Sequence, residues 1–392
     1  MLQFPIYLDN CATTACDTRV VEAMLPYFTQ YYGNASSRSH AFGWKAQAAV
    51  ETAQQQVAAL IGAEPGEIIF TSGATESCNL ALRGICDLYA GTGRHIITVK
   101  TEHKAVLDTC RALEKKGTEI TYLDVDVNGQ ISLPALEAAI KSTTILIAVM
   151  WANNETGVIL PINEIGAIAR KHQVLFFSDA TQAAGKVPVN VKTAGLGLMA
   201  FSSHKLYGPK GAGALYVSRK NPRARLIAQI TGGGQQEQIR SGTLNVPGIV
   251  GFGKAAALCR EAMPEEALRL GAFRDQLETA LLTIPDVAIN GAASERLPQI
   301  CNASFGYLNS NEMLSTFNKD LAVSSGSACT SGSLDPSYVL KAMQLPDARA
   351  KAAIRFSCGR YTTAEEIDHA IRFVREAIHT LRMNSPAWQL RD

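Results

Sequence analysis

A lysine follows a predicted buried strand near the middle of the chain. The apolar run from Leu198 to Phe201 predicts the strand, and Ser202-Ser203-His204-Lys205 comes directly after it, before a turn rich in glycine. Because a buried ammonium group is costly, a lysine at this place calls for a chemical reason. One reason is covalent, since the Lys205 amine can form a Schiff base with an aldehyde cofactor. Taken alone, Lys205 is equally compatible with an ordinary lysine on a surface loop.

Asp179 is a candidate for the acid that would face such a cofactor. The run from Val174 to Phe177 predicts a second short strand, and Asp179 stands just past its end. Ligands of an open α/β sheet lie beyond the carboxyl ends of its strands, so we expect Asp179 and Lys205 to share one rim. Pyridoxal phosphate enzymes pair a Schiff-base lysine with an acid that faces the pyridine nitrogen. The pair therefore predicts pyridoxal 5'-phosphate, although Asp179 alone is also compatible with a helix cap.

A turn that contains glycine predicts the site of the cofactor phosphate. The stretch Thr71-Ser72-Gly73-Ala74-Thr75-Glu76 follows the predicted strand Ile68–Phe70 and precedes a helix that we expect to begin near Ser77. The free N–H groups at a helix start bind phosphate, so the backbone at Ala74 is a candidate ligand. Such turns are common, and this prediction depends on the lysine. The side chains that can complete the cradle are Thr75, Ser202 and His204.

Three more polar residues are expected at the same rim. His103 follows the predicted strand Ile96–Val99, where it is either a surface loop histidine or a group that stacks on the cofactor ring and acts as acid or base. Asn154 follows the predicted strand Ile145–Met150 and can hydrogen-bond the cofactor oxygen or the substrate. Gln182, a short way past the acid, can do the same.

Two arginines occur where an anion can bind. Arg355 follows Ala353-Ile354 at the end of a weak strand, and its planar fork suits the carboxylate of an amino-acid substrate. The alternative for Arg355 is a salt bridge to the final helix. Arg240-Ser241-Gly242-Thr243 follows Gly232-Gly233-Gly234 and suits a loop that closes over phosphate, in this chain or in a neighbouring subunit.

The stretch Ser324-Ser325-Gly326-Ser327-Ala328-Cys329-Thr330-Ser331-Gly332 presents one cysteine among small residues. Small side chains give a loop little to pack with, so we expect a mobile loop over about residues 324–334. Such a loop can carry a reactive thiol. Because a free thiol has a pKa of about 8.5, an activating partner is expected. The alternative is a flexible linker with an incidental cysteine.

Apolar runs and helical periods alternate along the first part of the chain. This alternation predicts a mostly parallel seven-stranded sheet, covered on both faces, in an α/β domain over residues 15–258. A helical stretch from Ala255 to Leu282, with a break near Pro264, then leads to weaker strands and a final helix that opens with a capping box at Thr363. Residues 1–14 and 259–392 are predicted to form a smaller α+β domain. The seven predicted strands are Ile68–Phe70, Ile96–Val99, Ile120–Leu123, Ile145–Met150, Leu175–Phe177, Leu198–Phe201 and Ala214–Val217.

Composition argues against a nucleic-acid-binding, membrane-spanning or secreted protein. The net charge of +2 over 392 residues indicates no nucleic-acid footprint, and the apolar run Ile145 to Ala152 is too short to span a membrane. No basic residue precedes Arg19, so a signal peptide is not expected. Nine cysteines without a Cys-x-x-Cys pair argue against a disulfide framework and a structural metal site. We therefore expect a cytoplasmic enzyme that binds neither nucleic acid nor membrane.

Together these motifs closely resemble the cysteine desulfurases of the IscS/NifS type, group I, within the class V aminotransferase-like enzymes. The resemblance runs from Tyr7-Leu8-Asp9 to the final helix and is strongest in the stretches Ser203 to Gly211, Arg240 to Thr243 and Ser324 to Cys329. It implies the PLP-dependent transferase fold, which is like that of aspartate aminotransferase. It also implies a homodimer with active sites near the subunit interface.

The resemblance assigns a role to each candidate residue. It implies Lys205 as the Schiff-base lysine, Asp179 at the pyridinium and His103 against the ring. It implies Gln182 at the phenolic oxygen of the cofactor and Cys329 as the sulfur acceptor. The implied phosphate ligands are Thr75, Ser202, His204 and, from the other subunit, Thr243, and the implied ligands of the substrate carboxylate are Asn154 and Arg355.

The predicted function is desulfuration of L-cysteine to L-alanine. Sulfur would pass as a persulfide on Cys329 to acceptor proteins such as an iron–sulfur scaffold, for cluster and other thio-cofactor biosynthesis. Three alternatives remain: a selenocysteine lyase, a plain aminotransferase, and a sulfur-relay interaction protein whose cofactor is structural. Transamination gives no reason for Cys329 among small residues, and intact Lys205, Asp179, His103 and Arg355 argue against a purely structural cofactor.

Overall fold

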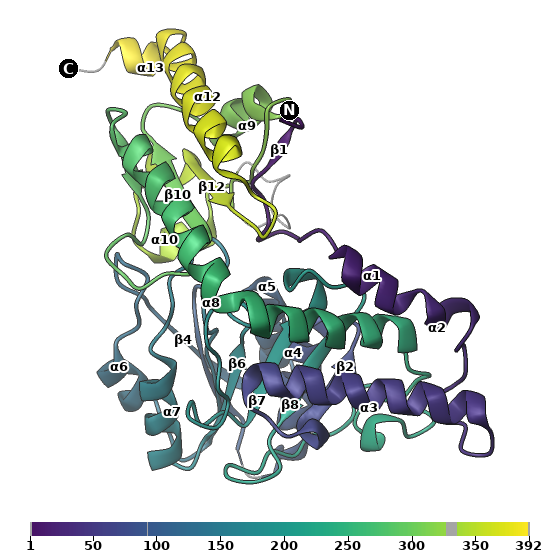
Figure 1. The fold of residues 1–392 in the computed structure, drawn as a ribbon. Coiled ribbons are helices and arrows are strands. Elements are labelled where there is room, and N and C mark those ends of the chain that lie inside the picture. The colour runs from purple at the N-terminus through teal and green to yellow at the C-terminus, as the bar shows by residue number, and fades with distance from the viewer. Residues whose placement is uncertain (1, 92, 327–334, 391–392) are drawn as a thin grey trace.

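A mostly parallel sheet of seven strands forms the centre of the larger part of the molecule (Figure 1). The computed structural model describes residues 2–91, 93–326 and 335–390. The strand order is β2-β8-β7-β6-β5-β3-β4, with β8 antiparallel to both of its neighbours and the other pairs parallel. All seven predicted strands are present, which confirms the predicted α/β class. The strands are β2 (Ile68–Thr71), β3 (His95–Val99), β4 (Glu119–Leu123), β5 (Thr144–Ala148), β6 (Leu175–Asp179), β7 (Leu198–Ser202) and β8 (Gly213–Val217).

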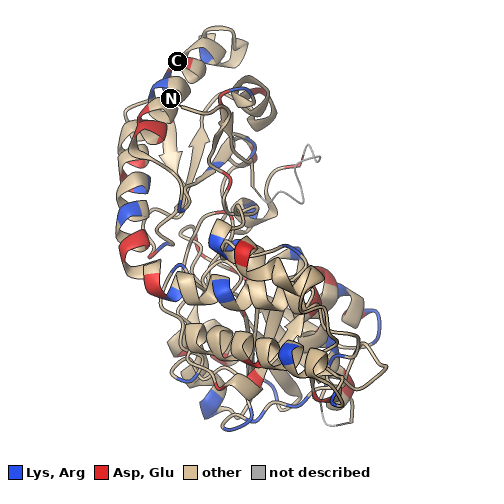
Figure 2. Cartoon of the chain, turned by 45° about the vertical axis from the view of Figure 1, so that its right-hand side comes forward, with Lys and Arg blue, Asp and Glu red and all other residues tan. Residues whose placement is uncertain are grey.

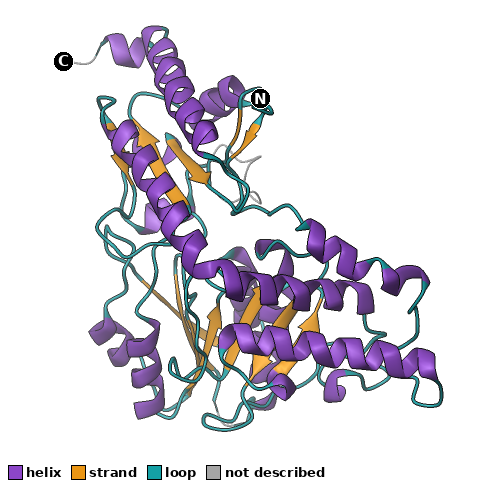
Figure 3. Ribbon diagram, in the orientation of Figure 1, coloured by secondary structure: helices purple, strands orange, loops and turns teal. Residues whose placement is uncertain are grey.

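Adjacent residues of the central strands point into two different cores. Phe176 and Phe177 are neighbours in β6, yet Phe176 packs in the core under α3, α7 and α8, and Phe177 packs in the core under α4 and α5. Because successive side chains of a strand alternate between its faces, helices must cover both sides of the sheet, as Figure 3 shows. The helices of this part are α1 (Thr18–Met24), α2 (Pro26–Thr29), α3 (Ala41–Ile61), α4 (Ala74–Leu88), α5 (Lys104–Glu114), α6 (Leu133–Ala138), α7 (Ile162–Lys171) and the first half of α8 (Val246–Leu282). Short 3₁₀ turns are η1 (Pro65–Glu67), η2 (Ser203–Lys205) and η3 (Gln236–Gln238).

Helix α3 shows how the local sequence sets the ends of an element. Its buried face includes Val50, Ala53 and Val57, at a spacing of three and four residues that is typical of an amphipathic helix. Gly62 ends the helix with φ of 70°, a left-handed conformation that glycine adopts at little cost. The helix therefore ends at this glycine.

The smaller part of the molecule is built on an antiparallel sheet of order β12-β10-β9. The N-terminal strand β1 joins this part, because it pairs in parallel with β11. Helix α12 packs its buried face, which includes Ile367, Val374 and Ile378, against the sheet, and Thr363 and Glu366 form the predicted capping box. The elements are β1 (Ile6–Tyr7), β9 (Val287–Ile289), β10 (Ile300–Phe305), α9 (Ser310–Phe317), β11 (Leu321–Ala322), α10 (Tyr338–Ala342), α11 (Asp347–Lys351), β12 (Ala353–Ser357), α12 (Ala364–Met383) and α13 (Pro386–Gln389). The domain boundaries expected after residues 14 and 258 stay a prediction.

Helix α8 joins the two parts. It begins at Val246, earlier than expected, and continues to Leu282 without the predicted interruption at Pro264. A proline inside a helix removes one backbone hydrogen bond and crowds the preceding turn. Because the helical residues before and after Pro264 are both packed against the protein, α8 bends at the proline and does not end there. Figure 1 shows this bend, with the first half of α8 beside α3 and the second half rising beside the smaller sheet.

Charge is spread over the molecule. Figure 2 shows acidic and basic residues interspersed along the helices, in keeping with the net charge of +2. The eight cysteines of the described ranges are all free thiols. In the part of the chain that the structure describes, no helix has the length and apolar character needed to cross a membrane.

Candidate active site

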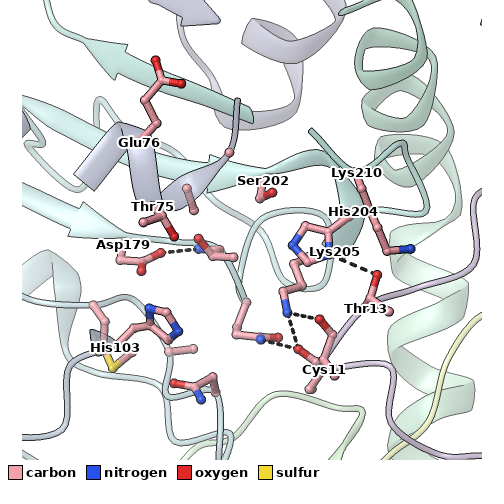
Figure 4. Close-up of a pocket in the computed structure, with 18 of the residues that line it drawn as sticks. Cys11, Thr13, Thr75, Glu76, His103, Asp179, Ser202, His204, Lys205 and Lys210 are labelled. Carbon is pink, nitrogen blue, oxygen red and sulfur yellow. Dashed lines mark hydrogen bonds between the residues drawn. The ribbon is translucent and has the colours of Figure 1, made fainter. Parts of the chain in front are cut away.

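A cavity of about 500 Å³ lies at the carboxyl ends of the central strands. It collects most of the predicted site residues, although they come from widely separated segments (Figure 4). The predicted residues that line it are Ala74, Thr75, His103, Asn154, Asp179, Gln182, Ser202, His204, Lys205 and Arg355. Thr243 does not line it and is exposed in the single chain. Cys329 lies outside the described residues.

Lys205 ends the 3₁₀ turn η2 after β7, and its amine points into the cavity (Figure 4). Its Nζ donates hydrogen bonds to the carbonyl oxygens of Cys11 and, at 2.6 Å, Ala12. The Gln182 amide donates to the same Cys11 carbonyl at 3.0 Å. The turn at residues 11–13 therefore forms one wall of the site. The sequence alone does not signal a role for this polar turn, because no local spacing indicates a contact across 194 residues.

Asp179 is the last residue of β6, and not a residue just past the strand as expected. Its side chain is buried and reaches the cavity. The backbone N–H of Thr181 donates to Asp179 Oδ1 at 2.9 Å, and the Cys78 thiol lies 3.9 Å from Oδ2. Burial raises the pKa of Cys78 well above its ordinary value, and the Asp179 charge adds to this, so Cys78 stays a neutral thiol. A fixed carboxylate at a strand end can stabilise a positive charge in the cavity.

The N-terminus of α4 forms the end of the cavity predicted to bind phosphate. The helix begins at Ala74, three residues before the expected Ser77, because Gly73 already serves as its N-cap. No side chain caps this helix, so its first N–H groups are available to an anion. A Cβ at Gly213 would lie only 2.5 Å from the Gly73 Cα, so β8 can run this close to the turn only with glycine there.

Arg240 is tied to this helix in the same chain. Its guanidinium bonds the Glu76 carboxylate through Nε at 2.7 Å and through Nη2 at 3.2 Å, and the Ser72 N–H also donates to Glu76 at 2.8 Å. Although burial opposes the shift, the bonds from Arg240 and Ser72 lower the pKa of Glu76. In this chain Arg240 therefore forms an ion pair with Glu76. From the sequence we expected Arg240 to belong to a loop that closes over phosphate.

His103 is the N-cap of α5. Its Nδ1 accepts a hydrogen bond from the Ala105 N–H at 3.1 Å, so the proton of the neutral ring is on Nε2. Burial lowers the pKa of His103, the Asp179 charge opposes this, and the Lys205 charge adds to the lowering. The structure thus presents a neutral imidazole with its orientation set by a helix cap.

His204 is also held as a neutral ring. Its Nδ1 lies 3.1 Å from the Thr13 hydroxyl, a second contact from the turn at residues 11–13. Burial, together with the charges of Lys205 and Lys210, lowers the pKa of His204 to about 4. A neutral ring can donate to or accept from a bound ligand near neutral pH.

Arg355 stands in the middle of β12, and not at a strand end as predicted. It donates to the Asn154 carbonyl oxygen at 2.7 Å and to Asp9 Oδ1 at 2.8 Å. The alternative of a salt bridge to the final helix is therefore wrong, since Asp9 is the ion-pair partner. Arg355 is only 1% exposed, and among the described residues its Nε and the Asn154 Oδ1 have no hydrogen-bond partner. Such buried, unpaired polar atoms at a cavity wall call for a polar ligand.

The chemistry of this lining fits pyridoxal phosphate with an amino-acid substrate. The uncapped start of α4 suits a phosphate, the Asp179 carboxylate suits a protonated ring nitrogen, and the Lys205 amine suits an aldehyde. The unpaired atoms of Asn154 and Arg355 suit the polar groups of a substrate. Residues of the lining that sequence reasoning assigned no role are Cys11, Ala12, Thr13, Met150, Ala152, Thr181, Lys210 and Gly211.

Comparisons with known proteins agree with this geometry. Residues 6–370 match the family described as Aminotransferase class-V. The chain is similar to the cysteine desulfurase IscS of Anaeromyxobacter sp. (strain Fw109-5), with 53% identity over 99% of this chain and 96% of that protein. Among solved structures it is similar to a NifS-like protein, with a TM-score of 0.88, 35% identity, and coverage of 97% of this chain and 100% of the other. It is also similar to SspA in complex with cysteine, with a TM-score of 0.80, 35% identity, and coverage of 91% of this chain and 99% of the other.

Proposed function

We infer that this chain, which belongs to the class-V aminotransferase family, is a cysteine desulfurase that converts L-cysteine to L-alanine. The sulfur passes, as a persulfide on Cys329, to acceptors for iron–sulfur cluster and other thio-cofactor biosynthesis. The observation that carries this conclusion is the convergence of Lys205, Asp179, His103 and Arg355 on one cavity. Relatives named as cysteine desulfurases, 51–53% identical over 99% of the chain, point to the same activity.

Enzymes of this family use pyridoxal phosphate, and we propose that the cavity holds it. When bound, this cofactor supplies an aldehyde that joins an amine and a ring that withdraws electrons from the Cα–H bond. Lys205 would join the aldehyde, Asp179 would face the ring nitrogen, His103 would lie against the ring, and Gln182 would bond the phenolic oxygen. The proposed phosphate ligands are the backbone at Ala74 and the side chains of Thr75, Ser202, His204 and, from a second subunit, Thr243.

Arg355 and Asn154 are proposed to bind the substrate carboxylate. Each Nη atom of Arg355 bonds one protein oxygen and carries a second N–H, so the guanidinium keeps donors that a carboxylate can use without displacing Asp9. Arg355 and Lys205 line the same cavity, and Lys205 is proposed to take the Cα proton of the bound substrate. The Nε2–H of His103 is the donor that would pass a proton to the reacting atoms.

Cys329 is proposed to receive the sulfur. Its thiolate attacks the sulfur of the substrate, a sulfur–sulfur bond forms, and the Cβ–S bond of the substrate breaks with its electron pair on the carbon. That carbon gains a proton and becomes the methyl group of alanine. Overall, one cysteine and one enzyme thiol give one alanine and one persulfide, so atoms and electrons balance without an added oxidant or reductant.

A homodimer is proposed as the working form. Thr243 is exposed and does not line the cavity of its own chain, which suits a role in the site of a second copy. Large apolar side chains are also exposed at α1 to α3, where the Tyr32 and Phe42 rings pack 5.3 Å apart at the surface. Such a cluster on a single chain favours burial against another subunit. The exposed side chains of this cluster are Val21, Leu25, Phe28, Tyr31, Tyr32, Phe42 and Trp44.

The test is alanine formation from L-cysteine, with a reductant present, by the wild type, Cys329→Ser and Lys205→Ala. We expect alanine from the wild type and none from either variant, with cofactor still bound in Cys329→Ser. Alanine from Cys329→Ser as well would contradict the sulfur route, and turnover of selenocysteine alone would favour a selenocysteine lyase. A cofactor-loaded wild type that forms no alanine would favour a sulfur-relay interaction protein.

A further inference from the structure

Tyr207 holds an uncommon backbone conformation two residues after Lys205. Its φ is 62°, in the left-handed region that residues with a side chain rarely occupy, and its side chain is completely buried. Such a conformation costs free energy and persists only where the surroundings impose it. The contacts that hold Tyr207 therefore also set the backbone that carries the lysine.

Two cations pack on the Tyr207 ring. The Lys186 Nζ lies 4.0 Å from the ring centroid, and the Arg360 guanidinium carbon lies 4.2 Å from it. The Arg360 backbone N–H also donates to the Tyr207 hydroxyl oxygen at 2.7 Å. Arg360 thus holds the ring by its face and by its hydroxyl.

Carboxylates keep the Arg360 guanidinium in place. Its Nη1 bonds Asp17 at 2.9 Å, its Nε bonds Glu266 at 2.5 Å, and its side chain is only 9% exposed. Bonds from Arg19 and Arg360 lower the pKa of Asp17, against the opposing effect of burial, so this partner stays ionised. A charged, multiply bonded guanidinium gives a fixed support for the ring.

The N-terminal segment forms hydrogen bonds with the backbone before and after Lys205. The Thr14 hydroxyl donates to the His204 carbonyl at 2.9 Å and accepts from the Tyr207 N–H at 2.9 Å. The Asp17 N–H donates to the Tyr207 carbonyl at 2.9 Å. Asp17 therefore bonds both Tyr207 and Arg360, and Thr14 joins Tyr207 to His204, so one network holds the backbone on both sides of Lys205.

We propose that Arg360 is a positioning residue for Lys205: by holding Tyr207 it sets the direction of the lysine amine in the cavity. Arg360 follows Arg355 on the segment that leaves β12, so the same segment carries the proposed carboxylate ligand and the support of the lysine. This inference rests on the proposed role of Lys205 as the cofactor-binding amine.

The test compares two arginines that anchor the same segment. Arg269 donates to the carbonyl oxygens of Arg360 and Thr362, both at 2.7 Å, and its guanidinium lies over the Phe273 ring; among the described residues no hydrogen bond or cation–π contact joins it to Tyr207. We expect Arg360→Gln to lower kcat about tenfold or more and to change KM for L-cysteine less than about threefold, because a displaced reacting group costs turnover more than binding. The visible absorption band of the bound cofactor should change in the Arg360→Gln holoenzyme and stay as in the wild type in Arg269→Gln. Arg360→Lys, which keeps a cation over the ring, should restore much of kcat.

Two outcomes would overturn the inference. Equal bands and equal kcat losses in Arg360→Gln and Arg269→Gln would show that Arg360 acts only as an anchor of the segment. If Arg360→Gln does not fold, Tyr207→Leu replaces it, because leucine removes both the ring face and the hydroxyl that Arg360 contacts, and an unchanged band and kcat in that variant would count against the inference. The wild-type holoenzyme is measured alongside, and a wild type that forms no alanine would contradict the proposed function instead.

Discussion

The cavity has two walls that are built in different ways. One wall follows the central strands and includes Asp179 at the end of β6 and Lys205 after β7. The other consists of the turn at residues 11–13 and Arg355 of the smaller sheet. The first is fixed by a hydrogen-bonded ladder of parallel strands, and the second by single hydrogen bonds and the Arg355–Asp9 ion pair. The residues proposed to act on the cofactor, Asp179 and Lys205, therefore lie on the wall that the sheet holds in place. The proposed substrate ligand Arg355 lies on the other wall, where its ion pair with Asp9 also stabilises the fold.

His103 offers the sharpest test of the strand-side wall. In His103→Asn the amide oxygen can still accept from the Ala105 N–H, so the cap of α5 is kept while the imidazole is lost. We expect the melting temperature to stay close to that of the wild type and kcat to fall about a hundredfold, in the range of a lost acid–base group. Steady-state kinetics and thermal unfolding of the holoenzyme measure the two effects. If His103→Asn keeps the kcat of the wild type, His103 is not an acid or base in the reaction.

Arg355 tests the opposite wall. Arg355→Lys loses the planar fork, and we expect kcat/KM for L-cysteine to fall about 10- to 100-fold, mostly through a higher KM, as for the loss of charge-assisted hydrogen bonds. Asp9→Asn is the matched change in the partner, because it leaves the arginine intact and removes the carboxylate that competes for it. KM in Asp9→Asn should be equal to or lower than in the wild type. A rise in KM as large as that of Arg355→Lys would show that the two residues bind substrate as a unit.

His204 joins the two walls, and its effect is the smallest of the three. The pKa of about 4 in the folded chain lies below that of an unfolded histidine, near 6.5, so the unfolded state takes up the proton first as the pH falls. Stability that is present above pH 6.5 is therefore lost between about pH 6.5 and 4. We expect the free energy of unfolding of the cofactor-free wild type to fall by about 1 kcal/mol more than that of cofactor-free His204→Asn over this range, because the ring is partly exposed and solvent reduces the effect. Parallel pH curves from denaturant titrations would show that His204 does not contribute.

Much of the strand-side wall could be predicted because its signals are local. Apolar runs predicted all seven strands of the large sheet, and the polar residues that follow them were expected to share an edge. The errors there were of position, such as a helix that begins at Ala74 because Gly73 already serves as its cap. At Pro264 we expected the helix to break, because the low helix propensity of proline is a local signal. That signal does not show that both halves of α8 pack against the protein, which keeps the helix continuous.

The amino-acid sequence by itself determined the sheet, the order of its helices and the placement of Lys205 and Asp179 at one rim. Tertiary structure alone decided that Cys11 and Ala12 hold the lysine amine, that Asp9 pairs with Arg355 across 346 residues, and that Arg240 bonds Glu76. The physical reason is the separation along the chain between the residues that interact. Hydrophobic periodicity is set by neighbours along the chain, whereas the partner of a buried charge is set by whichever distant segment the packed cores bring beside it.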